Sequence, residues 1–284
     1  MIVAAAQTGP VLTDDLGAGV EEAVRLIIRA AERGANLIAF SELFLTPFFP
    51  NRLEADFERW FAEIHDPRLK PIFKSAQQNN IAVVLPFAEK CGSSFYNSAA
   101  LIGPDGEVIG VYRKVHIPAI FPSLAEGGTG SYEKFYFAPG TELPVFDVKG
   151  TRVGIQICYD RKFPEASQML AAKGAQIVVM PICAATYGES SLREDTWELP
   201  LRARSYDSGV FVVAVNRAGN EHGRRHIGRS MIIDPVGAKI VCEAGTDRSE
   251  LLTATLDLEH VRVAQTSLPW WRDRRNELYM RDQF

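Results

Sequence analysis

Three residues with the chemistry for acyl transfer each stand at the end of a short apolar run. Glu42, Lys114 and Cys158 all lie within two residues of such an end. A carboxylate accepts protons, an ammonium group stabilises an oxyanion, and a thiol attacks a carbonyl carbon. Together they would supply the base, the cation and the nucleophile for acyl transfer at an amide-type carbon, without any histidine.

The sequence around Cys158 predicts a nucleophile at a turn between a strand and a helix. An apolar strand leads into Cys158, and a helix is expected to begin at Pro164, because proline is favoured in the first helical turn. The backbone N–H of Tyr159 would bind an oxyanion there, and a nearby Lys114 would lower the thiol pKa. The alternative is an inert buried cysteine. The remaining cysteines have no comparable setting: Cys91, Cys183 and Cys242.

Glu42 and Lys114 are expected to meet inside the protein. Leu43 and Phe44 follow Glu42, so burial would raise the pKa of this carboxyl group and allow it to take a proton at neutral pH. Alternation along a strand places Tyr112 and Lys114 on one side, and a buried ammonium group needs a carboxylate or an oxyanion as its partner. The alternatives are a surface glutamate just past a strand and a basic strand end.

Strands must position these residues, and short β-branched runs recur along the whole chain. Several runs are apolar throughout, which indicates strands buried on both faces. Turn residues predict hairpins at 104–106 and 234–237. The expected strands are Ile2–Ala6, Leu37–Phe40, Ile81–Leu85, Glu107–Tyr112, Arg152–Ile157, Ile177–Met180, Val210–Val215 and Ser230–Ile233.

Helical patterns alternate with these strands. Apolar residues at helical spacing predict a helix over 20–31 that stops at Gly34. A second helix is expected from Pro164 to about Lys173, with Gly174 as its stop. A third is expected over 193–207, where an internal proline, Pro200, should kink or split it. The segments around the two glycines are similar, which favours two similar α/β halves, although such a junction is common enough to arise by chance.

Composition places the chain among globular proteins. It has 284 residues, of which 46% are hydrophobic and 23% charged, so general disorder, a collagen-like chain and a coiled coil are excluded. With 31 basic and 35 acidic residues the net charge is −4, which does not fit a nucleic-acid-binding protein. The apolar runs are too short to span a membrane and no signal peptide is evident, so we expect a cytoplasmic protein with reduced cysteines.

Motifs for other chemistries do not occur in the sequence. It contains no phosphate-binding loop, no G-x-S-x-G and no H-E-x-x-H. His222 and His226 are four residues apart, but Arg224 and Arg225 lie between them. These two cations would repel a metal ion, so a metal site is not favoured there. The remaining interpretation is a loop that is solvated or contacts the substrate.

A family resemblance rests on five ordered segments: Ala4–Pro10, Gly34–Glu42, Tyr112–Pro118, Glu133–Gly140 and Gly154–Glu165. They resemble the nitrilase superfamily of carbon–nitrogen hydrolases. The resemblance implies one α/β domain over residues 1–284, an α-β-β-α sandwich with two mixed sheets and flanking helices. It also implies a homodimer or homotetramer that joins sandwiches across an α surface. Apart from the resemblance, Trp270, Trp271 and four arginines make residues 265–284 aromatic and basic, which predicts a C-terminal arm used for packing or dimer contact.

The same resemblance implies roles for individual residues. Glu42 would be the general base, Lys114 the stabiliser of the tetrahedral intermediate and Cys158 the nucleophile. Glu133 matches a second glutamate of the family, which helps to position Lys114 and the substrate. The family works on small molecules with no metal and no organic cofactor, so none is expected here.

Short segments resemble particular branches of the family. Cys158–Asp160 matches the amidase type, whereas true nitrilases usually have Cys-Trp-Glu there. Residues 45–50 and 160–165 are similar to N-carbamoyl-D-amino acid hydrolases, although Lys162 stands where that group has a second arginine. Tyr132–Gly140 instead resembles N-carbamoylputrescine amidases. We therefore expect hydrolysis of an N-carbamoyl amino acid or amine. The alternatives are a small carboxamide substrate and a catalytically silent interaction protein on the same fold.

Arg161 is a candidate for binding one end of the substrate. It lies three residues after Cys158, and a guanidinium group can hold a carboxylate through two hydrogen bonds. A diamine substrate would favour acidic residues there. The alternative is a structural ion pair with Asp160 or Glu165.

Three weaker candidates for substrate binding also have structural alternatives. His116 would hydrogen-bond the catalytic glutamates or lie in the core. Asn216 would line the pocket or cap a strand. Phe48, with Phe44 and Phe49, would wall the pocket or pack in the core.

Overall fold

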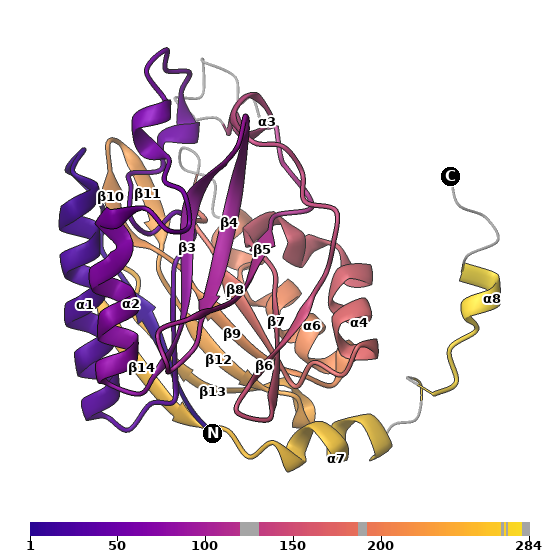
Figure 1. The fold of residues 1–284 in the computed structure, drawn as a ribbon. Coiled ribbons are helices and arrows are strands. Elements are labelled where there is room, and N and C mark those ends of the chain that lie inside the picture. The colour runs from indigo at the N-terminus through magenta and orange to yellow at the C-terminus, as the bar shows by residue number, and fades with distance from the viewer. Residues whose placement is uncertain (120–130, 187–191, 268–269, 271, 280–284) are drawn as a thin grey trace.

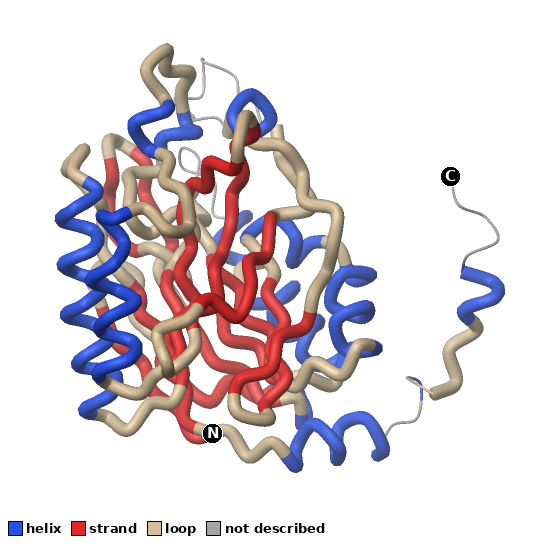
Figure 2. The backbone as a smooth tube through the Cα atoms, in the orientation of Figure 1, coloured by secondary structure: helices blue, strands red, loops and turns tan. Residues whose placement is uncertain are grey.

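The computed structural model describes residues 1–119, 131–186, 192–267, 270 and 272–279. Within these residues, two six-stranded sheets stack face to face and helices cover both outer sides (Figure 1). Figure 2 shows the strands as a central block between the two helical layers. The expected α-β-β-α sandwich is confirmed.

The first sheet combines the N-terminal half of the chain with one late strand. Its order is β14-β1-β2-β3-β4-β5. β1, β2 and β3 run parallel, and the other neighbours pair antiparallel, so the sheet is mixed. The bounds are Ile2–Gln7 (β1), Leu37–Phe40 (β2), Ala82–Cys91 (β3), Ser94–Ile102 (β4), Val108–Arg113 (β5) and Glu250–Thr255 (β14).

The second sheet repeats this plan in the C-terminal half. Its order is β13-β12-β9-β8-β7-β6, with β7, β8 and β9 parallel and the outer strands antiparallel. A separate hairpin, β10 with β11, follows β9. The bounds are Val145–Val148 (β6), Thr151–Ile155 (β7), Ile177–Pro181 (β8), Phe211–Val215 (β9), Ala218–Glu221 (β10), Arg224–Ile227 (β11), Met231–Asp234 (β12) and Lys239–Glu243 (β13).

Helices α1 and α2 cover the first sheet, and α4 and α6 cover the second (Figure 1). Short 3₁₀ helices occupy several loops. The α-helices are Leu16–Glu32 (α1), Lys70–Gln78 (α2), Glu133–Tyr136 (α3), Pro164–Ala172 (α4), Leu192–Asp195 (α5), Glu198–Ser208 (α6), Glu259–Ser267 (α7) and Asn276–Tyr279 (α8). The 3₁₀ helices are Phe49–Asn51, Glu58–Trp60, Pro67–Leu69, Cys158–Lys162 and Val236–Ala238.

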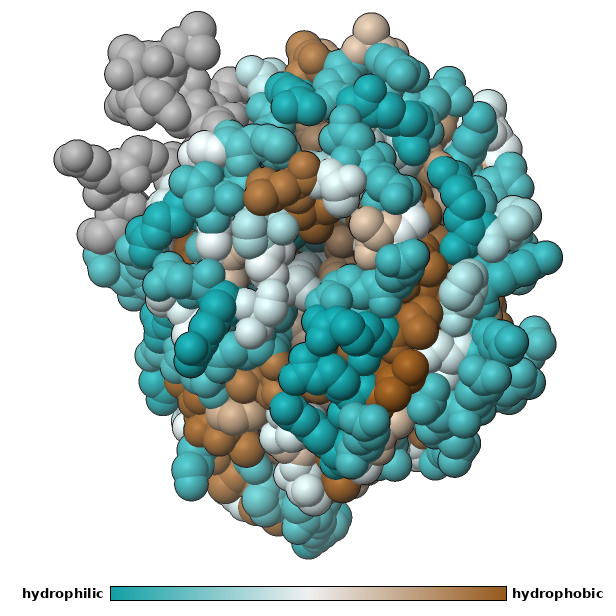
Figure 3. Space-filling model, turned by 90° about the vertical axis from the view of Figure 1, so that its left-hand side faces the viewer, coloured by the Kyte–Doolittle hydropathy of each residue, from teal (hydrophilic) through white to brown (hydrophobic). Residues whose placement is uncertain are grey.

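Alternation along the strands explains why the sheet is buried on both faces. In β1, Val3 and Ala5 point into the core between the sheets, whereas Ala4 and Ala6 pack under the helices. Because both faces of the strand are buried, the side chains on each face must be apolar. The sequence of such a strand therefore does not alternate between apolar and polar residues. The helices turn their polar sides outward, and the face on the side of α1 and α2 is largely hydrophilic (Figure 3).

The predicted similarity of the two halves is confirmed. Gly34 follows α1 and leads to β2, and Gly174 follows α4 and leads to β8. Both glycines have a left-handed φ, +76° and +86° respectively, which explains why glycine ends each helix. β2 and β8 then occupy matching places inside the parallel part of their sheets.

The eight expected strands and both hairpin turns are present, with ends shifted by a few residues. The third expected helix is split into α5 and α6 at residues 196–197, ahead of Pro200. Pro200 lies in the first turn of α6, where its missing N–H costs no hydrogen bond. The C-terminal arm is described only in part, and in Figure 1 α8 lies apart from the sandwich. Among the described helices, none is long and apolar enough to cross a membrane.

Candidate active site

Strand ends from both sheets bring the three chemically interesting residues together. Glu42 follows β2, Lys114 follows β5, and Cys158 follows β7. The Lys114 Nζ donates to Glu42 Oε1 at 2.7 Å and to Glu133 Oε2 at 2.6 Å. Both the Glu42 and the Lys114 side chains are fully buried. The prediction that Lys114 points inward beside Glu42 is confirmed.

Two residues that the sequence reasoning missed complete this buried network. Asn97 Nδ2 donates to Glu42 Oε1 at 2.8 Å and to Glu133 Oε2 at 3.3 Å. Ser131 Oγ donates to Glu133 Oε1 at 3.0 Å. Asn97 is a polar residue within a mostly apolar strand, β4, and that position was an available signal. Ser131 carried no comparable signal.

Cys158 occupies the expected turn. It begins a 3₁₀ helix, and α4 starts at Pro164. Its φ is +48°, a left-handed conformation that is costly for a residue with a side chain and is concentrated at functional sites. Among the described residues, no acceptor is hydrogen-bonded to the Tyr159 backbone N–H, so this group remains open to an oxyanion.

Asp160 anchors the turn, and it accounts for His116. The buried Asp160 carboxylate accepts hydrogen bonds from the Ile157 N–H at 2.9 Å and the Tyr112 hydroxyl at 2.6 Å. The His116 ring lies 2.8 Å from the same carboxylate and stacks on Phe163 at 3.7 Å. The predicted hydrogen bond from His116 to the catalytic glutamates is not found among the described residues, because the ring is held against Asp160 and Phe163.

The charges of the network set its protonation. Burial acts to raise the pKa of Glu42, but the Lys114 charge and the hydrogen bonds from Lys114 and Asn97 outweigh it and hold the pKa below its usual value. The expected rise is thus wrong. The pKa of Glu133 is raised, mainly by burial and further by the Glu42 charge. Burial acts to lower the pKa of Lys114, but the two glutamates raise it, so this side chain stays charged.

The Cys158 thiol is protonated at neutral pH. Burial raises its pKa most, the Glu42 charge adds to this, and the charges of Arg161 and Lys114 only partly oppose it. Lys114 does act to lower the pKa of this thiol, as predicted, but burial outweighs it. The thiol therefore needs a base. Glu42 Oε2 is buried and, within the part of the chain that is described, has no hydrogen-bond partner, which leaves it available to accept the proton.

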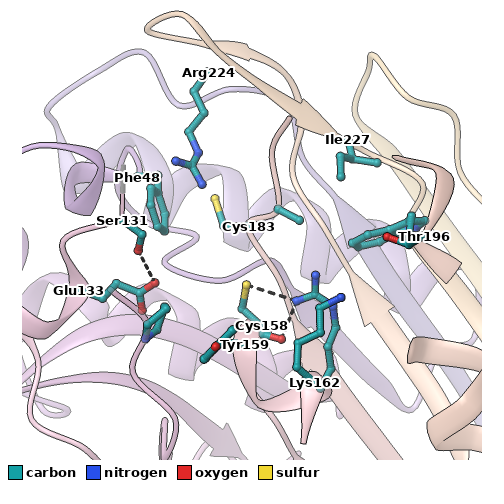
Figure 4. A pocket seen from close by; sticks show the side chains of 14 residues that line it. Phe48, Ser131, Glu133, Cys158, Tyr159, Lys162, Cys183, Thr196, Arg224 and Ile227 are labelled. Atoms are coloured by element: carbon teal, nitrogen blue, oxygen red, sulfur yellow. Dashed lines mark hydrogen bonds between the residues drawn. The ribbon is translucent and has the colours of Figure 1, made fainter. Parts of the chain in front are cut away.

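Cys158 opens into a pocket of about 140 Å³. Figure 4 shows its thiol and that of Cys183 among the side chains that line this pocket. Of the three phenylalanines, only Phe48 lines it; Phe44 packs on Phe40 at 4.4 Å, and Phe49 lies in an aromatic core cluster. The lining residues are Phe48, Pro118, Ser131, Glu133, Cys158, Tyr159, Arg161, Lys162, Cys183, Ala184, Thr196, Trp197, Arg224 and Ile227.

The described side chains that line the pocket carry more positive than negative charge. Within the described part of the chain, Arg161, Lys162 and Arg224 line it together with one acid, Glu133, which is bound to Lys114. The Arg161 Nη1 donates to the Cys158 carbonyl oxygen at 2.6 Å and lies 3.5 Å from its Sγ.

The structural alternative for Arg161 was an ion pair with Asp160 or Glu165. Neither pair is found among the described residues. Arg161 therefore remains a candidate for contact with the substrate.

Two further expectations change. Asn216 accepts a hydrogen bond from the Ala184 N–H at 2.9 Å and donates to the Gly228 carbonyl at 2.8 Å, so it ties strand ends together and does not line the pocket. Cys183 was expected to have no special setting, yet it lines the pocket, with its Sγ 3.7 Å from His226 Nδ1. No group of three or more potential metal ligands occurs in the described ranges.

Comparison with known proteins decides the family. The carbon–nitrogen hydrolase family profile matches residues 2–266. The chain belongs to the carbon–nitrogen hydrolase family. This carbon–nitrogen hydrolase is therefore an enzyme that acts on non-peptide C–N bonds, as the predicted resemblance implied.

The carbon–nitrogen hydrolase has relatives over nearly its full length. It is 34% identical to an N-carbamoylputrescine amidase from Arabidopsis thaliana, over 94% of this chain and 90% of the relative. It is also 34% identical to a citrullinase from Francisella tularensis, over 89% and 88% of the two chains.

Solved structures of the family share its fold. A carbon–nitrogen hydrolase from Helicobacter pylori is 25% identical with a TM-score of 0.87, covering 98% of this chain and 96% of that one. An amidase from Nesterenkonia sp. AN1, in which acrylamide has added to the active-site cysteine, is 26% identical with a TM-score of 0.78 and covers 98% of each chain.

Proposed function

We propose that this enzyme hydrolyses the carbamoyl C–N bond of an N-carbamoyl amino acid or N-carbamoyl amine through a thioester on Cys158. The observation that carries the proposal is the buried Glu42–Lys114–Glu133 network next to a thiol that opens into a pocket. Burying an ammonium group between two carboxylates costs free energy of desolvation. Stabilising an oxyanion during acyl transfer is a function that accounts for this cost.

The first half of the proposed reaction forms the thioester. Glu42 Oε2 accepts the proton of Cys158 while Sγ attacks the carbamoyl carbon, and the carbonyl oxygen becomes an oxyanion. Lys114 and the Tyr159 N–H stabilise this oxyanion. Glu42 then returns the proton to the leaving nitrogen, the C–N bond breaks, and the acyl group stays on Cys158 as a thioester.

The second half releases the acyl group. Glu42 accepts a proton from water, whose oxygen attacks the thioester carbon, and Lys114 again stabilises the oxyanion. The C–S bond breaks, and Cys158 regains a proton. For a carbamoyl substrate the final products are the free amine, CO₂ and ammonia. Glu133 holds Lys114 in place throughout, through their hydrogen bond of 2.6 Å.

The charge of the pocket favours a substrate with a carboxylate. Arg161, Lys162 and Arg224 line the pocket, and guanidinium groups bind carboxylates well. The ammonium group of a carbamoyl diamine would meet these cations unfavourably. The names of the two curated relatives, an N-carbamoylputrescine amidase and a citrullinase, support a carbamoyl substrate but differ in its other half.

A small carboxamide is the second candidate substrate. The same network would cleave an amide to an acid and ammonia, and the Nesterenkonia neighbour is an amidase. The two functions differ only in the group attached to the carbonyl carbon, so the pocket must discriminate between them.

A substrate panel with ammonia detection tests the proposal. It should contain N-carbamoyl amino acids of both hands, N-carbamoyl amines and the matching carboxamides, each assayed with the parent enzyme and with Cys158→Ala. We expect the highest kcat/KM for a carbamoyl amino acid and no turnover by the variant. Faster cleavage of the amides, or turnover by Cys158→Ala near the parent rate, would contradict the proposal.

We also propose a homodimer or homotetramer joined through the helices of the second sheet. Met169 on α4 and Leu199 on α6 are exposed apolar side chains, at 50% and 65% of their full area, and Trp270 packs on the exposed Tyr206 of α6 at 5.0 Å. Burying this face would be favourable. Light scattering of the purified enzyme should give at least twice the monomer mass, whereas a monomer at micromolar concentration would contradict the proposal.

A further inference from the structure

A second buried ion pair lies behind the proposed base. Arg217 follows β9, and its Nη1 donates to Glu221 Oε2 at 2.6 Å. Their side chains are 0% and 2% exposed. Neither residue lines the pocket, and neither takes part in the reaction steps proposed above.

The Arg217 guanidinium holds the turn that follows Glu42. Its Nη2 lies 3.0 Å from the carbonyl oxygens of Leu43 and Thr46, and 3.4 Å from that of Glu42. Leu43 has a φ of +49°, which is unfavourable for a residue with a branched side chain. Three carbonyl oxygens that converge on one point repel one another, and a cation with several N–H donors offsets that repulsion.

Glu221 fixes the other end of the same turn. Its Oε1 accepts a hydrogen bond from the Phe48 N–H at 2.7 Å, and its Oε2 accepts one from the Val11 N–H at 2.8 Å as well as the bond from Arg217. One ion pair thus holds the chain from the base to the aromatic wall of the pocket. A lysine would supply the charge but not the planar fork of donors.

The buried Arg217–Glu221 pair contributes more to orienting the backbone of the Glu42 turn than to the stability of the folded protein. Two charges lose their hydration when buried, and well-packed apolar side chains often give equal or better stability. What apolar side chains lack is directed donors for the carbonyl oxygens. The carbonyl oxygen of Glu42 itself is one of the three that Arg217 holds. Arg217 therefore contacts the stretch of backbone from which the Glu42 side chain extends.

We propose that Arg217 is a positioning residue for the general base: by holding the carbonyls of the Glu42 turn, it sets the direction in which Glu42 Oε2 faces the Cys158 thiol. The inference rests on the proposed function of Glu42 and Cys158. It assigns no contact between Arg217 and the substrate.

Turnover of Arg217→Lys is the first test. A displacement of the base by about 1 Å costs on the order of 10²-fold in rate, so we expect kcat to fall by about 10- to 100-fold. KM should stay close to the parent value, because the pocket lining is intact. The matched control is Ile72→Ala, which empties part of the core under α2, away from the pocket. It should lower thermal stability while leaving kcat unchanged.

Alkylation of Cys158 by iodoacetamide gives a readout without substrate. Its rate, followed against pH by the mass of the proteolytic peptide that contains Cys158, reports transfer of the thiol proton. We expect Arg217→Lys to alkylate more slowly than the parent at neutral pH and to reach the parent rate only at higher pH, where hydroxide removes the proton. The Ile72→Ala profile should match that of the parent.

The two readouts separate this inference from the proposed function. Slower alkylation in Arg217→Lys, together with a parent enzyme that cleaves no member of the panel, would refute the proposed substrate and keep the positioning role. A parent-like kcat and alkylation profile in Arg217→Lys would overturn the positioning role alone. If Arg217→Lys fails to fold, Glu221→Gln provides a second test, since it keeps the shape of the side chain and removes the carboxylate charge that holds the Arg217 guanidinium in place; a parent-like result there also overturns the inference.

Discussion

Cys158 and Cys183 line the same pocket, yet their surroundings differ. Cys158 lies beside Glu42, Lys114 and Arg161, whose charges all act on its thiol. Cys183 lies beside His226, with its Sγ 3.7 Å from the ring Nδ1. Burial raises the pKa of both thiols. A lowered thiol pKa is therefore not what distinguishes the proposed nucleophile.

The available base and the oxyanion site make the difference. Burial, with the Arg217 charge adding to it, lowers the pKa of His226 to about 4, so this imidazole is neutral at pH 7 and supplies no positive charge to an oxyanion. Cys158 instead has the ionised Glu42 carboxylate, together with Lys114 to stabilise an oxyanion. The comparison teaches that a thiol in a pocket becomes a nucleophile through the groups placed around it.

The largest expected effect separates the two cysteines directly. Loss of the proposed nucleophile in Cys158→Ala should lower kcat by about 10⁴-fold or more, as for other covalent catalysts. Cys183→Ala removes only a wall contact and should change kcat by less than about tenfold. Ammonia release from the preferred substrate measures both. Equal losses in the two variants would break the comparison.

The next effect tests the base on the Cys158 side. Glu42→Gln keeps the shape of the side chain but cannot accept a proton, so kcat should fall by about 10²- to 10⁴-fold. A matched control is Glu89→Gln, another buried glutamate, bound to Arg113 and Ser98 and absent from the pocket lining. The control should keep most of the activity, and a parent-like kcat in Glu42→Gln would remove Glu42 as the base.

The smallest effect concerns pH and the Cys183 side. His226 has a folded-state pKa of about 4, below its usual 6.5. Between these values the unfolded chain binds a proton that the folded chain does not, so stability is full above pH 6.5 and falls as the pH falls toward 4.

Urea denaturation measures this loss. From pH 7 to pH 5 the His226 contribution should lower the free energy of unfolding by about 2 kcal/mol. His226→Gln should lose that part of the pH dependence, because glutamine does not titrate. An unchanged difference between pH 7 and pH 5 in the variant would show that His226 is not held neutral.

Local pattern was sufficient to predict eight of the strands, the helices α1 and α4, and the inward direction of the Lys114 side chain. Strand alternation fixed the side on which Lys114 lies, and an ammonium group directed into an apolar interior needs a carboxylate. Gly34 and Gly174 ended two helices for a reason visible in the sequence, since a left-handed residue there favours glycine. These features depend on neighbours within a few positions of the chain.

Local sequence pattern did not predict the contacts of Asn97 and Arg217, nor the position of Cys183 in the pocket. Each acts across more than forty residues of sequence: Asn97 on Glu42, Arg217 on the Glu42 turn, and Cys183 beside a strand of the later hairpin. The packing of one sheet on the other sets these distances, and no local pattern encodes them.

The amino-acid sequence by itself determined the fold class, the buried strands and the residue types available for chemistry. Only the tertiary structure decided how protons are distributed among them. The pKa of Glu42 is lowered, opposite to the expectation, and that of Cys158 is raised by burial although Lys114 acts to lower it. The physical reason is that a buried pKa is a balance of desolvation against every nearby charge, and that balance exists only once both sheets have brought Glu42, Lys114 and Cys158 together.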